Sequence, residues 1–161
     1  MILGIDVGQN GGLSLLDKHR NIIIKRVMPI NHEKELDTKS LINLIKNNDV
    51  KAVFIEKVHA MPNQGVVSMF TFGKHFGEIL GTIKTLGIPY HLVRPREWQA
   101  YAHKDVDKRL KPKEKSLLAV KKFYPDIDFR KSERAKVDHD GIVDATLIAL
   151  YGLQEYVIQE T

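Results

Sequence analysis

The apolar segments of this sequence have two different periods, and the difference decides its fold class. Residues 51–56 form a short continuous apolar run, which is typical of a strand covered on both faces of a sheet. Residues 38–48 instead place leucine and isoleucine at helical spacing. Strands that alternate with helices need crossover connections, so the sequence predicts an α/β protein with a mixed sheet.

The other segments extend this pattern along the chain. The first three strands are separated by short turns, which predicts an antiparallel meander. Glycine, proline and asparagine mark most of the element ends. We expect strands at residues 1–6, 11–17, 21–28, 51–56 and 88–93, and helices at residues 38–48, 65–86, 95–101, 112–124 and 138–151.

Composition limits the class of protein further. The 161 residues suffice for one sizeable core, so we read residues 1–161 as a single domain. No apolar run is long enough to span a membrane, and the start lacks the pattern of a secretory leader. We therefore expect a protein of the cytoplasm or an organellar matrix, not secreted and with no membrane partner. The lack of cysteine excludes disulfides, zinc–cysteine sites and thiol catalysis.

Positive charge is concentrated in one part of the chain. The net charge is +5, and residues 103–136 alone hold twelve Lys and Arg against six Asp and Glu. Such a stretch favours a polyanionic partner, because each neutralised phosphate releases counterions. The alternative is a solvated surface that only maintains solubility.

Two predicted strands end in acidic residues, and the last predicted helix carries two more. Asp6 ends the first strand and Glu56 ends the fourth, so the two carboxylates leave the same edge if these strands are parallel neighbours. Asp140 and Asp144 are four residues apart and share one helical face. Taken singly, Asp6 could be a turn residue, and Asp138 or Asp140 a helix N-cap.

A cluster of these four carboxylates requires cations, because like charges at short distance resist joint ionisation. Oxygen ligands favour Mg²⁺ or Mn²⁺, and two such ions support phosphodiester hydrolysis. The glycines that follow Asp6 would then leave room for a phosphate; they are Gly8, Gly11 and Gly12.

Three glycines recur at four-residue steps in the helix predicted at residues 65–86. They are Gly73, Gly77 and Gly81. Interior glycines destabilise a helix, so close packing must compensate. The stripe therefore faces either the sheet or the same helix of a second subunit.

Five stretches, in order, resemble the RuvC-like Holliday junction resolvases of the ribonuclease H-like superfamily, especially the phage and organellar branch. They are LGIDVGQNGG, FIEKVHA with QGVVSMFTFGKHFGEILG, HLVRPREWQ, PKEKSLLAVKKFYP and DHDGIVDATLIALYG. The resemblance implies a ribonuclease H-like fold, with a five-stranded mixed sheet flanked by helices. It also implies a homodimer that nicks four-way DNA junctions symmetrically with Mg²⁺.

The resemblance also implies roles for single residues. Asp6, Glu56 and Asp144 match family metal ligands. At the remaining ligand position this chain has Gly141, so we assign that role to Asp140, with Asp138 and His139 as alternatives.

Lys115 resembles the family lysine near the scissile phosphate. Residues 58–65 follow Glu56 where the family places its junction-contacting element, with Met61 as a wedge between bases and Asn63 and Gln64 on base edges. Trp98 is expected in the core.

The sequence thus predicts a Holliday junction resolvase with branched DNA as its partner. A branched-DNA-binding recombination factor that does not cut, or a ribonuclease H-type enzyme acting on RNA–DNA hybrids, remains an alternative. The further residues expected to bind the DNA backbone are Arg94, Arg96, Lys104, Lys108, Arg109, Lys111, Lys113, Lys115, Lys121 and Lys122.

Overall fold

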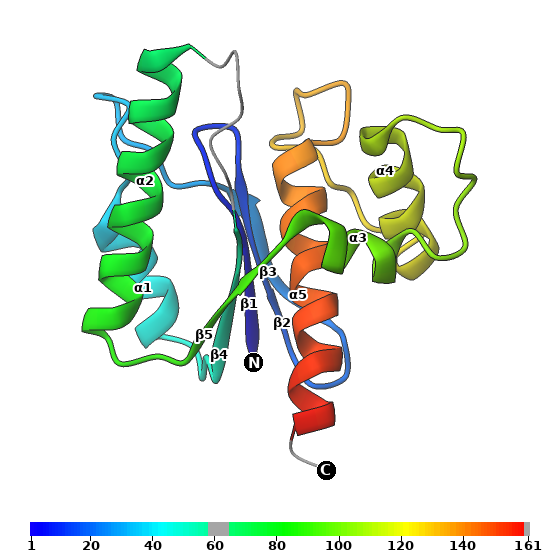
Figure 1. The fold of residues 1–161 in the computed structure, drawn as a ribbon, viewed down its shortest axis with the longest axis horizontal. Coiled ribbons are helices and arrows are strands. Elements are labelled where there is room, and N and C mark those ends of the chain that lie inside the picture. The colour runs from blue at the N-terminus through cyan, green and yellow to red at the C-terminus, as the bar shows by residue number, and fades with distance from the viewer. Residues whose placement is uncertain (58–64, 160–161) are drawn as a thin grey trace.

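The computed structural model describes residues 1–57 and 65–159. Its centre is a five-stranded sheet in the order β3-β2-β1-β4-β5 (Figure 1). β1 pairs antiparallel with β2 and parallel with β4, so the sheet is mixed, as predicted. The strands are β1 (Ile2–Asp6), β2 (Gly12–Leu16), β3 (Ile22–Val27), β4 (Ala52–Glu56) and β5 (Tyr90–Val93).

The helices begin where local sequence signals indicate. Proline is the first residue of both α3 and α4, and the glutamate of each first turn accepts a hydrogen bond from the N–H before the proline. None of the helices in the described part of the chain is long and apolar enough to cross a membrane. The helices are α1 (Thr38–Lys46), α2 (Val66–Thr85), α3 (Pro95–Ala102), α4 (Pro112–Phe123) and α5 (Asp140–Gln159).

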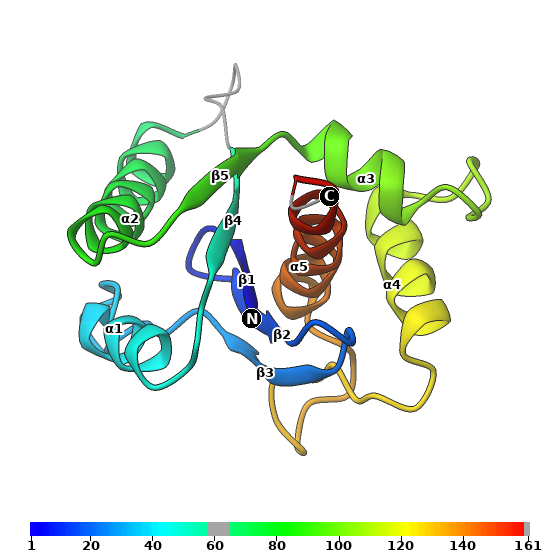
Figure 2. The same cartoon turned by 90° about the horizontal axis from the view of Figure 1, so that it is seen from below.

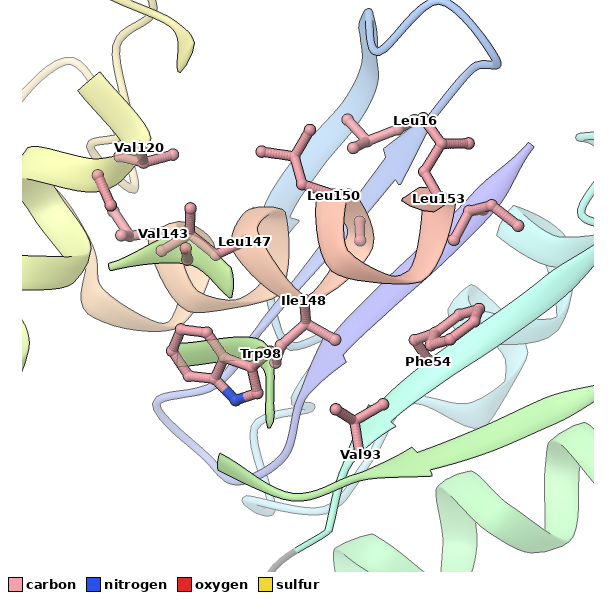
Figure 3. Packing of buried hydrophobic residues seen from close by; sticks show 14 of the residues in the cluster. Leu16, Phe54, Val93, Trp98, Val120, Val143, Leu147, Ile148, Leu150 and Leu153 are labelled. Atoms are coloured by element: carbon pink, nitrogen blue, oxygen red, sulfur yellow. The ribbon is translucent and has the colours of Figure 1, made fainter. Parts of the chain in front are cut away.

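The helices form one layer on each face of the sheet (Figures 1 and 2). α1 and α2 cover one face, where Leu3 and Ile5 of β1 join their core cluster. α5 covers the other face, with α3 and α4 on its outer side. Figure 3 shows this second cluster, in which Trp98 and Phe54 pack around the apolar side chains of α5.

α5 differs from the predicted helix at both ends. It begins at Asp140 and not at residue 138, since the Nδ1 atom of His139 accepts the N–H of Ile142 and closes the first turn (3.4 Å). It continues to Gln159 and does not end at residue 151. Gly152 lies inside the helix, at a position where a Cβ would fall 2.5 Å from the ring of Phe54. Glycine is needed at this position for packing.

Glycines also let α5 approach the first hairpin closely. A Cβ on Gly4 would fall 2.2 Å from the carbonyl oxygen of Ala145, and one on Gly12 would fall 2.4 Å from that of Gly141. No side chain fits at such distances. Gly4 lies two residues before Asp6, so this contact fixes α5 against the end of β1.

The turn after β1 uses its glycines for backbone reasons. Gly8 has a φ of +126°, which other residues rarely adopt. A Cβ on Gly11 would fall 2.1 Å from the carbonyl oxygen of Asp6. The interpretation that Gly11 and Gly12 leave room for a phosphate is therefore replaced by these packing requirements.

The glycine stripe of α2 faces away from the sheet. A Cβ on Gly73, Gly77 or Gly81 would meet no atom of the described residues within 4 Å. The interpretation that this stripe packs on the sheet is wrong. The other interpretation, that the stripe faces a second subunit, agrees with this outward orientation but stays a prediction.

Candidate active site

Asp6 and Glu56 lie side by side at the ends of two parallel strands. The register pairs Ile5 with Ile55, so the next residue of each strand leaves the sheet at the same edge. The two carboxyl groups are close enough to shift each other's pKa. Burial, and then the charges of Glu56 and Asp144, raise the pKa of Asp6 well above its usual range.

Glu56 has a second partner that sequence reasoning missed. The indole Nε1 of Trp98 donates a hydrogen bond to Glu56 Oε1 (3.0 Å). Burial raises the pKa of Glu56, whereas this hydrogen bond and the one from Asp6 lower it. Trp98 is only 1% exposed, so the prediction that it belongs to the core is confirmed. Its polar atom in addition fixes the direction of a carboxylate.

Asp144 approaches the same point from α5. Burial raises its pKa to about 7, and the charges of Glu56 and Asp140 act in the same direction. The Ser116 hydroxyl opposes this shift by hydrogen bonding. The Oδ1 atom of Asp144 is buried and has no hydrogen-bond partner within residues 1–57 and 65–159. A buried carboxylate oxygen without a partner is unfavourable unless a ligand satisfies it.

Asp140 lies at the outer rim of this group. Its side chain is 54% exposed and pairs with Lys113 Nζ at 2.5 Å. Its charge contributes to the raised pKa of both Asp6 and Asp144. We call Asp6, Glu56, Asp140 and Asp144 the carboxylate cluster.

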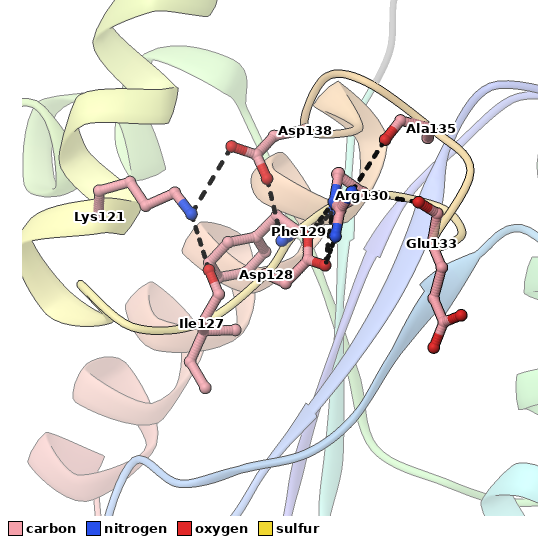
Figure 4. Close-up of polar contacts among 8 residues, drawn as sticks. All are labelled: Lys121, Ile127, Asp128, Phe129, Arg130, Glu133, Ala135 and Asp138. Atoms are coloured by element: carbon pink, nitrogen blue, oxygen red, sulfur yellow. Dashed lines mark hydrogen bonds and ion pairs between the residues drawn. The ribbon is translucent and has the colours of Figure 1, made fainter.

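The two alternatives to Asp140 serve the start of α5. Asp138 accepts the N–H of Phe129 (3.0 Å) and pairs with Lys121 at 3.6 Å (Figure 4). His139 is the N-terminal cap described above. Arg130 holds the same segment by bonding Asp128 and nearby carbonyl groups. Asp138 and His139 are thus engaged in structure, whereas Asp140 acts electrostatically on the cluster.

The donor set suits a hard cation, although its side chains are not arranged around one ion. Among the described residues, no three Asp, Glu or His side chains are placed to hold one ion as they stand. The cluster nevertheless offers only oxygen ligands, and one of its buried oxygens has no partner. A divalent ion would satisfy that oxygen and relieve the repulsion among the carboxylates.

No family model matches the sequence, and no curated protein matches it. Solved structures do match its fold. T. thermophilus RuvC in complex with a Holliday junction substrate has a TM-score of 0.68 at 15% identity, covering 97% of this chain and 94% of that one. The yeast mitochondrial Holliday junction resolvase Ydc2 has a TM-score of 0.64 at 13% identity, covering 99% and 80%.

A third match is the fowlpox virus resolvase, solved with Holliday junction DNA. Its TM-score is 0.57 at 16% identity, and the match covers 96% of this chain and 99% of that one. This chain has the fold of the RuvC-like resolvases. At these identities the likeness establishes the fold alone, and the predicted ribonuclease H-like architecture is confirmed.

Within this resolvase fold, the lysine beside the carboxylates is Lys113. Lys115 lines a different part of the surface, a hollow that it shares with His103 and Lys104. The helical periodicity of α4 could have distinguished Lys113 from Lys115 in the sequence. Lys113 precedes the buried Ser116 and Val120 by three and seven residues, so it shares their face of α4, which packs toward α5.

The predicted DNA contacts fall into three groups. Met61, Asn63 and Gln64 lie outside the described residues. Four cations are engaged within the fold: Arg109 with Asp107, Lys113 with Asp140, Lys121 with Ile127 and Asp138, and Lys122 with the carbonyl of Asp105. All four except Lys121 are also exposed. The remaining ones are exposed or partly exposed: Arg94, Arg96, Lys104, Lys108, Lys111 and Lys115.

A hollow of about 440 Å³ lies at the rim of the carboxylate cluster. Its lining includes Asn10 of the first turn, Lys113 of α4 and Asp140 of α5. This hollow gives an extended ligand access to the outer side of the cluster. The larger hollow of about 580 Å³ lies farther along α4, against residues 125–138.

Proposed function

We propose that this protein is a metal-dependent endonuclease that resolves four-way DNA junctions. The observation that carries the proposal is the convergence of three partly buried carboxyls, Asp6, Glu56 and Asp144, at one sheet edge, each with a raised pKa. A protein that only binds DNA gains nothing from clustered carboxylates facing phosphate. The solved structures with the same fold include resolvases in complex with Holliday junction DNA.

Mg²⁺ or Mn²⁺ is the proposed cofactor, with two ions per site. When bound, such ions supply an activated water and stabilise the leaving oxygen. Asp6, Glu56 and Asp144 would hold them, with Asp140 at the rim.

The residues around the cluster give it order. Trp98 fixes the direction of Glu56, and Ser116 bonds Asp144. Lys113 is bound to Asp140 at the open side, where its ammonium group can reach a phosphate oxygen of the bound strand. We therefore assign to Lys113 the role that the family resemblance gave to Lys115.

Cleavage of a synthetic four-way junction tests the proposal. The purified protein should cut opposed strands with Mg²⁺ or Mn²⁺, and EDTA should stop the reaction. Asp6→Asn should stop it as well. Asp49→Asn is the matched control, because Asp49 is exposed and pairs with Lys51 outside the cluster.

Two outcomes would contradict the proposal. Cleavage retained by Asp6→Asn would remove the role of the cluster. Junction binding without cleavage by any divalent ion would favour the non-cutting recombination factor. An RNA–DNA hybrid and a linear duplex belong in the same panel, because preference for the hybrid would indicate a ribonuclease.

We further propose that the protein acts as a homodimer through α2. Val66 and Phe70 are 84% and 75% exposed, and they continue the outward glycine stripe at helical spacing. Exposed apolar side chains at the start of α2 and glycines farther along the same side allow a second copy of the helix to pack closely. Two sites in one dimer would allow paired cuts.

The mass in solution tests this contact. Sedimentation equilibrium should give a dimer, and Phe70→Glu should shift the protein to the monomer. Leu118→Glu on α4 is the control, since Leu118 is also exposed and apolar but lies off α2. A monomeric wild-type protein, or a dimer unaffected by Phe70→Glu, would contradict the proposal.

A further inference from the structure

Another hollow, of about 360 Å³, lies between α3 and the start of α4. Its lining is Gln99, Ala100, His103, Lys104, Val106, Lys108 and Lys115. Three of these side chains are lysines, and none is acidic. The hollow is therefore a concave cationic surface, which is the form that suits a phosphate group.

The three lysines are available for such a ligand. Among the residues that the structure describes, neither Lys104, Lys108 nor Lys115 forms an ion pair. Asp107, on which the charge of Lys115 acts, is itself bonded by the guanidinium of Arg109 (2.7 Å). No acidic side chain is paired with the three lysines among the described ion pairs.

The back wall of this hollow is joined to the carboxylate cluster by hydrogen bonds. His103 Nε2 lies 3.1 Å from the Oγ of Ser116, which is 4% exposed. Ser116 in turn faces Asp144, and its hydroxyl lowers the pKa of that carboxyl. A serine hydroxyl has a single proton, so donation of that proton to Asp144 would require His103 Nε2 to be the donor to Ser116.

The same histidine also touches the partner of Glu56. The His103 ring lies edge-on to Trp98, with the ring centroids 5.8 Å apart. Trp98 donates to Glu56. Two of the four carboxylates are therefore held by side chains that contact His103, at the wall of the cationic hollow.

We propose that this hollow binds a DNA backbone phosphate other than the one that is cut, and that His103 and Ser116 connect it to Asp144. The inference rests on the proposed nuclease function for its substrate class. A phosphate held by Lys104, Lys108 and Lys115 would order α3 against α4 and so keep Ser116 on Asp144. His103 and Ser116 are positioning residues in this scheme.

Titration with inorganic phosphate tests the hollow directly, without DNA or metal. The imidazole resonances of His103 should shift in a saturable manner. The shift should disappear in the triple variant Lys104→Ala, Lys108→Ala, Lys115→Ala. It should persist in Asp6→Asn, so failure of the hollow and failure of the nuclease are distinguishable. A shift that persists in the triple variant would overturn the proposal.

Junction affinity gives a second test, measured with EDTA so that no strand is cut. The triple variant should bind about tenfold more weakly, and its plot of log K against log salt should be shallower by about 1. The matched control removes three exposed lysines from elsewhere, by Lys18→Ala, Lys39→Ala, Lys46→Ala. Equal losses of junction affinity in both triple variants would show that the hollow contributes only general surface charge, and would contradict the proposal.

The link to Asp144 is tested by separating rate from binding. Ser116→Ala should lower the single-turnover cleavage rate about tenfold and leave junction affinity unchanged, as expected for a group that orients a ligand. His103→Leu should behave alike, whereas His103→Gln, which keeps an N–H donor, should recover most of the rate. Equal rates for His103→Leu and His103→Gln would refute the connection.

Discussion

The two faces of the sheet use glycine in opposite ways. On the α5 face, Gly4 and Gly12 lie where a side chain would collide with the backbone of the helix. On the α2 face, the glycines of the helix point away from the sheet into open space. The first arrangement fixes the distance between α5 and the strands β1 and β2. The second leaves one side of α2 uncovered. The carboxylates are on the fixed side, where the position of α5 decides whether Asp144 meets Asp6.

The largest effect should follow from removing a charge on the fixed side. We expect Asp144→Asn to lower junction cleavage by about 1000-fold, because the variant keeps the shape of the side chain but loses an anionic ligand. Single-turnover assays with Mg²⁺ measure the loss, and binding in EDTA should be unchanged. A loss below tenfold would mean that α5 does not serve the site.

Gly4→Ala tests the close contact itself. The new Cβ would fall 2.2 Å from Ala145 oxygen, and a backbone atom cannot move aside easily. We expect the free energy of unfolding to fall by about 3 kcal/mol or more. Urea denaturation measures it. A change under about 1 kcal/mol would show that α5 shifts freely on the sheet.

The pH dependence of stability should also belong to the α5 face. The pKa of Asp144 is raised to about 7, so the folded state binds the proton more tightly than the unfolded chain. Without divalent ions, stability should therefore fall by about 1 to 3 kcal/mol as pH rises from about 4 to about 7, and then level off. Thermal melts in EDTA follow this change.

Thermal melts of a variant and of the metal-bound protein test whether Asp144 causes that pH dependence. Asp144→Asn should flatten the decline, and Mg²⁺ should stabilise the wild-type protein more at pH 8 than at pH 5, because the ion competes with protons. A stability that rises from pH 4 to pH 7 in EDTA would contradict the assignment to the cluster.

The smallest effect is expected on the open face. Gly77→Ala should raise the stability of the monomer by about 1 kcal/mol, because alanine favours a helix and its Cβ meets no described atom. If α2 forms the dimer contact, the same variant should weaken the dimer. A more stable monomer together with a weaker dimer would support the difference between the two faces. A less stable monomer would contradict it.

Much of the fold could be predicted from local patterns. The apolar runs that end at Asp6 and Glu56 mark neighbouring parallel strands, and the helical face of Asp144 points to the same edge. The C-terminal end of α5 could not be predicted, because Gly152, which resembles a helix end signal, packs inside the helix on Phe54, which is far away in the sequence. Likewise, a stripe of glycines does not reveal which side of a helix is covered.

The supporting residues of the site were harder to find than its carboxylates. The Trp98 indole reaches Glu56 only because α3 packs against α5, and no spacing in the sequence indicates that packing. The choice between Lys113 and Lys115 depends on which face of α4 meets α5. Both questions concern tertiary placement, whereas acids at strand ends are visible in a single segment.

The covering of β1 and β2 by α5 has a consequence for synthesis of the protein. The ribosome releases the five strands well before it releases α5, so one face of the sheet stays bare and Asp6 and Glu56 lack Asp144 during that interval. If the chain is the nuclease proposed above, a growing polypeptide in this condition has no assembled cutting centre. The topology would then delay nucleolytic activity until α5 has been translated.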